Sequence, residues 1–101
     1  PLEAGRQRNA EAERSPITAE KEQYLRKKEE ERKKRRRQRL LEELEQAIAG
    51  LEQSISRLEE ELTLPEVYKD YQACLQRQNQ LEQDRSSLQA HLEKWLALAE
   101  G

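Results

Sequence analysis

The amino-acid sequence predicts an all-α protein, specifically an antiparallel two-helix coiled-coil hairpin with a flexible N-terminal linker. Only three glycines and three prolines interrupt the 101 residues, and long stretches without these residues favour long helices. Hydrophobic residues make up 34% of the chain and charged residues 40%, which leaves too little apolar surface for a thick globular core. Two series of residues, mostly apolar, are spaced alternately by three and four positions, as in a coiled-coil seam.

The first helix is expected to follow a linker at residues 1–17, where small and polar residues predominate and no apolar period is present. Two signals could start this helix. Ser15 could act as the N-cap with Pro16 in the first turn, or Thr18 could act as the N-cap. From either start a helix can continue to Leu62.

The first seam occupies the C-terminal half of this helix. Its members are Leu41, Leu44, Ile48, Leu51, Ile55, Leu58 and Leu62. Pro65 ends the helix, because proline lacks a backbone donor and disfavours the helical conformation at the preceding residue. We therefore expect a turn at about residues 63–68.

A second series follows the turn with the same spacing but with fewer apolar members. Its positions are Tyr71, Cys74, Gln78, Leu81, Arg85, Leu88, Leu92, Trp95 and Ala99. Two long helices joined by so short a loop must run antiparallel, so residues 40–99 are predicted to form the hairpin. Counting back from the turn places Tyr71 opposite Leu62, and Trp95 opposite Arg37.

Charge is strongly segregated along the chain, although the formal net charge is only −2. Residues 21–39 carry eleven Lys and Arg against four Glu, whereas residues 40–101 carry five Lys and Arg against thirteen Asp and Glu. We call residues 18–39 the basic stem, which we expect to be helical, and residues 32–39 the basic run. The cations of the basic run are Arg32, Lys33, Lys34, Arg35, Arg36, Arg37 and Arg39.

The basic run permits two interpretations. Its cations could contact nucleic-acid phosphates, and binding would then weaken steeply as salt is added. No aromatic residue lies within the run, so such binding should follow charge and shape more than base sequence. Alternatively, the run is a solvated helical stem that connects the hairpin to a preceding domain.

The sequence does not predict an enzyme. Cys74 is the single cysteine and His91 the single histidine, so we expect neither an internal disulfide nor a metal site. A two-helix rod offers no pocket that would perturb the pKa of its carboxylates, which we expect on solvated faces.

The expected location is the cytoplasm, without a membrane contact. No apolar stretch approaches the roughly 18 residues of a membrane span, and no secretory signal opens the chain. We expect a monomeric hairpin. Because the chain begins at Pro1 and not at Met, we also expect it to be part of a longer protein.

Several motifs together resemble a known module. These are the basic stem, the heptad series that follows it, the turn at residues 65–68 (Pro-Glu-Val-Tyr), and the closing element at residues 95–98 (Trp-Leu-Ala-Leu). The combination is similar to the C-terminal coiled-coil domain of ABC-F proteins of the Uup type, which are soluble, duplicated ATP-binding-cassette ATPases. The resemblance covers about residues 20–99.

This resemblance implies a parent protein that hydrolyses ATP in upstream cassettes and acts on the ribosome in translation. It implies that the hairpin domain contacts ribosomal RNA, the ribosome or DNA. No cofactor is expected in this chain itself, because glycine occurs only at positions 5, 50 and 101 and cannot form a Gly-rich phosphate loop. The alternative function is a purely structural coiled-coil spacer or a self-association arm.

Overall fold

The computed structural model describes residues 16–101, and the chain divides into two units, residues 1–36 and residues 37–101. All regular structure among the described residues is helical: α2 spans Pro16–Glu61, α3 spans Pro65–Tyr68 and α4 spans Tyr71–Glu100. The prediction of an all-α fold is confirmed. Ser15, one of the two candidate N-caps, lies outside the described residues, and Thr18 lies within α2. Residues 1–15 of the predicted linker lie outside the described residues.

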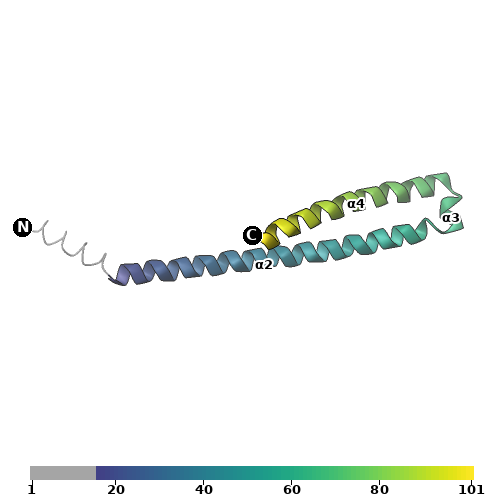
Figure 1. Cartoon of the computed structure of the whole chain (residues 1–101). Coiled ribbons are helices and arrows are strands. Elements are labelled where there is room, and N and C mark those ends of the chain that lie inside the picture. Colours follow the sequence, from purple (N-terminus) through teal and green to yellow (C-terminus); the bar gives the residue numbers. More distant parts are fainter. Residues whose placement is uncertain (1–15) are drawn as a thin grey trace, which may run out of the picture. The chain divides into compact units, whose positions relative to one another are not determined.

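The unit of residues 37–101 is a helical hairpin. In Figure 1, α4 runs back alongside the second half of α2, and the short helix α3 lies at the turn between them. Side-chain contacts described below join α2 to α4 along the hairpin, and Arg85 of α4 also pairs with Glu59 of α2 at 3.0 Å. The predicted antiparallel hairpin is therefore confirmed.

The connection between α2 and α4 contains ordered structure of its own. Pro65 opens α3, where its missing N–H group costs no helical hydrogen bond. Val67 is buried in this short helix, and α3 contacts α4. Asp70 then caps α4, because one of its carboxylate oxygens accepts hydrogen bonds from two backbone N–H groups of α4 at 3.1 and 3.3 Å. The connection therefore continues to residue 70.

The core is a thin stripe, as the composition predicts. All seven members of the first seam are buried or half-buried. Among the described residues, the most deeply buried apolar side chains are Leu58, Val67 and Leu81. Each contributes about 1.5–3 kcal/mol from the removal of apolar surface from water, so stability rests on a small number of contacts.

The seam of α4 differs from the predicted one at every second position. The positions shared with the prediction are Cys74, Leu81, Leu88 and Trp95. The alternating positions that turn inward are Arg77, Asp84, His91 and Leu98, in place of Gln78, Arg85, Leu92 and Ala99. Tyr71 is 75% exposed and Leu92 is 41% exposed, so the prediction that both belong to the seam was wrong.

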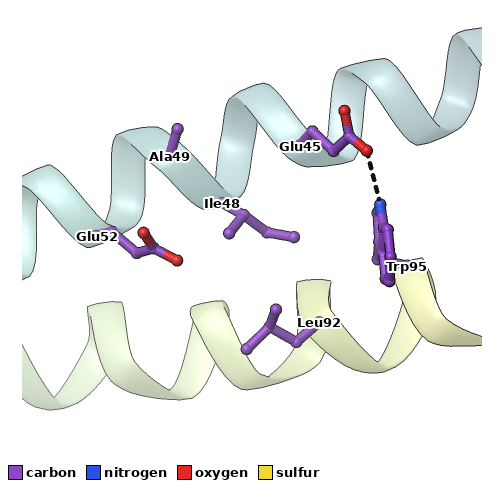
Figure 2. A pocket seen from close by; sticks show the side chains of 6 residues that line it. All are labelled: Glu45, Ile48, Ala49, Glu52, Leu92 and Trp95. Carbon is purple, nitrogen blue, oxygen red and sulfur yellow. Dashed lines mark hydrogen bonds between the residues drawn. The ribbon is translucent and has the colours of Figure 1, made fainter.

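Near the C-terminal end of α4, Trp95 shows how the helices are paired. Its indole Nε1 donates a hydrogen bond to Oε1 of Glu45 at 3.1 Å (Figure 2). The prediction that Trp95 lies opposite Arg37 was therefore wrong. The longer connection explains the difference, because a later start of α4 moves each of its residues toward the turn relative to α2.

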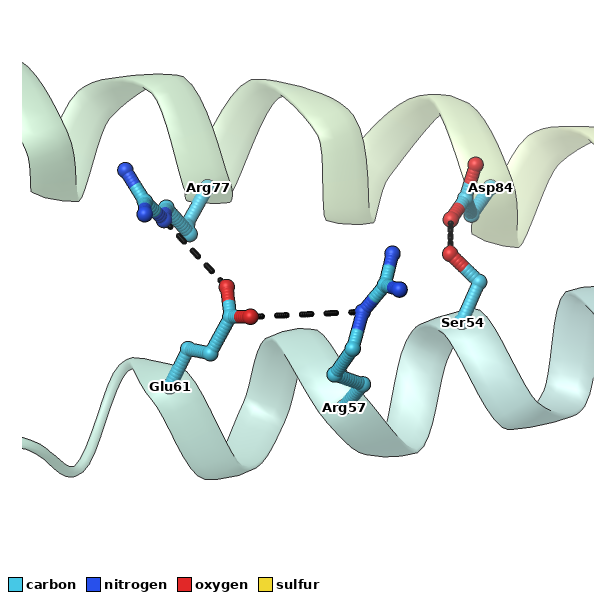
Figure 3. Close-up of polar contacts among 5 residues, drawn as sticks. All are labelled: Ser54, Arg57, Glu61, Arg77 and Asp84. Carbon is cyan, nitrogen blue, oxygen red and sulfur yellow. Dashed lines mark hydrogen bonds and ion pairs between the residues drawn. The ribbon is translucent and has the colours of Figure 1, made fainter.

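Near the turn, the ion pairs of Glu61 show the same pairing of α2 with α4. Glu61 contacts Arg77 of α4 at 3.3 Å and Arg57 of its own helix at 3.9 Å (Figure 3). Because α2 ends at Glu61 and this residue pairs with Arg77, Tyr71 lies beyond the last turn of α2. Tyr71 therefore has no α2 residue opposite it, which explains its exposure.

Between these two ends, a buried carboxylate joins the helices. Asp84 is 7% exposed and accepts hydrogen bonds from Ser54 Oγ at 2.6 Å (Figure 3) and from Gln80 Nε2 at 2.8 Å. Among the described residues, every buried side-chain nitrogen or oxygen has a hydrogen-bond partner. A slipped register would remove the Ser54 hydroxyl, which is the partner on the other helix, from this buried carboxylate, so the contact favours a single pairing of the helices.

We expect the substitution Asp84→Asn to lower the free energy of unfolding by about 1–2 kcal/mol, because the amide loses two charge-assisted hydrogen bonds in a buried site. Urea unfolding followed by circular dichroism measures this loss. The exposed Glu82→Gln change on the same helix is the control and should cost less than about 0.5 kcal/mol. A double-mutant cycle with Ser54→Ala should give a coupling of about 1 kcal/mol; a coupling of zero would contradict the role of this pair.

Candidate nucleic-acid interface

The basic run lies on helix α2, and all of its side chains are exposed. Three glutamates at positions 29–31 precede cations by four residues, an order that stabilises a helix. One such pair forms: Arg35 Nη2 lies 4.0 Å from Glu31 Oε2, with both side chains mostly exposed. Within the described residues, the other six cations of the run have no ion pair. The run therefore presents concentrated and largely uncompensated positive charge to solvent.

The boundary between the two units of the chain falls after Arg36, within the basic run. Cations follow one another without interruption except at Gln38. At about 100° per residue, the five cations at residues 32–36, which belong to one unit, surround the helix and do not form one stripe. This arrangement suits contact with an anion by charge and shape, and it offers no side chain for base stacking.

The basic stem also carries an apolar feature that sequence analysis did not single out. Tyr24 and Leu25 are both more than half exposed, and Lys28 Nζ lies 5.2 Å from the centroid of the Tyr24 ring. This cation–π contact is worth about 0.5–1 kcal/mol at an exposed site. A pair of large apolar residues within a segment of charged residues was the available signal in the sequence.

An open groove of about 330 Å³ lies between α2 and α4 near Trp95. Figure 2 shows its lining residues, with Leu92 and Trp95 on α4 and the others on α2. The lining residues are Glu45, Ile48, Ala49, Glu52, Leu92 and Trp95. The sequence did not predict this groove.

The remaining candidate residues have ordinary structural environments. Cys74 is a half-buried free thiol. His91 is half-buried and its Nδ1 lies 2.7 Å from the carbonyl oxygen of Ser87, so a proton on Nδ1 is donated to that carbonyl. In residues 16–101, no group of three or more His, Cys, Asp or Glu side chains is placed to hold a metal ion. None of the helices in this range combines the length and the hydropathy needed to cross a membrane.

These features define a class: a helical-hairpin domain with a thin core and a highly charged surface. A family model described as the ABC transporter C-terminal domain matches residues 32–100, which include the whole basic run and the hairpin. The chain belongs to this family, and the resemblance inferred from its turn and closing tryptophan element is confirmed. It is an accessory domain of ABC-type ATPases and is not itself catalytic. Comparisons with curated proteins and with solved structures gave no match.

Proposed function

We propose that this accessory domain binds nucleic acid or the ribosome, and that the cations of the basic run contact RNA or DNA phosphates. The observation that carries the proposal is the exposure of the run. Among residues 16–101, one of its seven cations forms an ion pair, at 4.0 Å. Like charges four residues apart on a helix repel each other. Bound phosphates would relieve this repulsion and release their condensed counterions.

The parent protein in this proposal is a cytoplasmic ATPase of the ABC-F type that acts in translation. Family membership supports the ATPase context, and the turn and closing element at residues 65–68 and 95–98 support the ABC-F type. ATP would bind in cassettes outside this chain. The domain would then tether the parent to an RNA-rich or DNA-rich surface.

The experiment that tests the proposal is a salt series of fluorescence anisotropy. The chain is titrated into a labelled RNA hairpin and a DNA duplex of equal length and mixed sequence. If five to seven cations contact phosphates, the plot of log K against log salt should have a slope of roughly −4.5 to −6.3 for the duplex. The ratio of the two affinities ranks RNA against DNA. Absence of binding at low salt would contradict the proposal and favour a structural spacer.

A further inference from the structure

The groove beside Trp95 has a defined chemical character. Its floor is apolar, and two carboxylates seven residues apart, Glu45 and Glu52, stand on α2 on either side of Ile48 (Figure 2). Glu45 is held in place by the Trp95 indole at 3.1 Å. A helix that fills this groove needs a large apolar side chain between two cations that are also seven residues apart.

The basic stem of this chain carries that pattern. Lys21, Leu25 and Lys28 are exposed and lie at helical positions i, i+4 and i+7, which share one face. Leu25 and its neighbour Tyr24 are the only large apolar residues between positions 19 and 39. Their exposure within such a polar segment is explained if another surface covers them.

We propose that the chain associates with a second copy of itself, with residues 21–28 of one copy lying in the groove of the other. Leu25 covers the apolar floor of the groove. Lys21 and Lys28 pair with Glu45 and Glu52 of the second copy. The interface joins a cationic helix to a groove with an acidic rim, and the charge spacing on both sides is one heptad.

The charges beyond the groove select a parallel orientation. One heptad after Lys28, a parallel helix brings Arg35 beside the acidic residues 59–61 of the second copy. An antiparallel helix would bring Arg35 beside the basic run of that copy, where like charges repel. In a parallel contact, the stem of one copy covers the groove of the other. One copy of such a dimer therefore keeps a free groove and the other keeps a free stem, so that further copies can bind.

This inference does not rest on nucleic-acid binding, since Lys21, Leu25 and Lys28, which define the contact, lie outside the basic run. Arg35 of the basic run enters only in the choice of orientation. The inference also differs from the monomeric hairpin expected from the sequence, because the groove depends on the pairing of α2 with α4.

Sedimentation velocity of the nuclease-treated chain over a wide range of concentration tests the proposal. We expect the average mass to rise above that of a monomer with concentration, and to fall as salt screens the pairs. Charge reversal by Lys21→Glu with Lys28→Glu should lower the association constant by about 10-fold or more. The reversal Glu45→Lys with Glu52→Lys should do the same, and mixing the two variants should restore association.

Trp95 reports the same contact, because it is the single tryptophan. Its emission in dilute wild-type chain should shift to shorter wavelength as a Trp95→Phe variant, which retains the basic stem, is added in excess. The control Arg26→Glu with Lys27→Glu changes the same charge on other faces of the helix and should leave association intact. A monomer at every concentration, or association that neither reversal weakens, would overturn the proposal. The stem reversal lies outside the hairpin, so its result does not depend on a change within the groove.

Discussion

Replacing Leu58 by alanine is expected to lower the free energy of unfolding by about 2–4 kcal/mol. Leu58 is only 5% exposed and is the most deeply buried apolar residue of the described chain. The cost combines lost burial of apolar surface with a cavity that two helices cannot collapse fully. Because a small hairpin has a stability of only a few kcal/mol, this variant should be largely unfolded at 37 °C.

Thermal and urea unfolding monitored by circular dichroism at 222 nm measures the effect. Leu40→Ala is the matched control, because Leu40 lies on the same helix and is exposed, and its removal should cost about 0.5 kcal/mol or less. If Leu58→Ala and Leu40→Ala lower the free energy of unfolding equally, the thin seam between α2 and α4 does not stabilise the hairpin.

The half of the hairpin supplied by α2 could be predicted from sequence because every seam position there is apolar. Leucine and isoleucine recur without interruption from Leu41 to Leu62, and only one helix face can bury them all. The turn was harder to place. Pro65 marked where α2 had to end, but the short helix α3 and the Asp70 cap extended the connection before α4 began.

The seam of α4 could be predicted only in part, because hydropathy does not choose between two adjacent polar residues. Asp84 and Arg85 are equally unfavourable in an apolar stripe, and the structure buries Asp84 because Ser54 lies opposite as a donor. Seven residues further along α4, the seam position assigned from hydropathy was wrong. Hydropathy favoured Leu92 over His91, whereas Leu92 lies at the edge of the groove. Apolar periodicity takes no account of hydrogen bonds between polar residues of the two helices. Such bonds help to decide which positions of α4 face α2.

The basic run and the groove also differ in how far the sequence predicts them. The exposure of the basic run followed directly from composition, because seven cations within eight positions cannot be buried in so thin a core. The groove depends on register. It forms only when Trp95 and Leu92 come to lie beside Glu45 and Ile48, and the predicted pairing placed Trp95 too far along α2.

Replacing four arginines of the basic run by glutamine is expected to weaken nucleic-acid binding by roughly 100- to 1,000-fold at near-physiological salt. The substituted residues are Arg35, Arg36, Arg37 and Arg39. Loss of four phosphate contacts should also make the salt slope shallower by about 3 to 4. The loss should be uniform across base sequences, since phosphate contacts carry no sequence information. Fluorescence anisotropy with two unrelated duplexes and an RNA hairpin measures both quantities.

The control variant removes the same amount of charge from the hairpin unit. It replaces Arg57, Lys69, Arg85 and Lys94, all exposed, by glutamine. The ion pairs of Arg57 and Arg85 that this control removes lie at the surface and contribute about 0–1 kcal/mol each. If local phosphate contacts drive binding, this control keeps most of the salt slope, because the basic run is intact. Equal losses in the two variants would mean that overall charge governs binding and that the run has no special role. Unchanged affinity in the basic-run variant would contradict the proposed interface and leave the spacer function, because the most concentrated positive charge of the chain would then contact no phosphate.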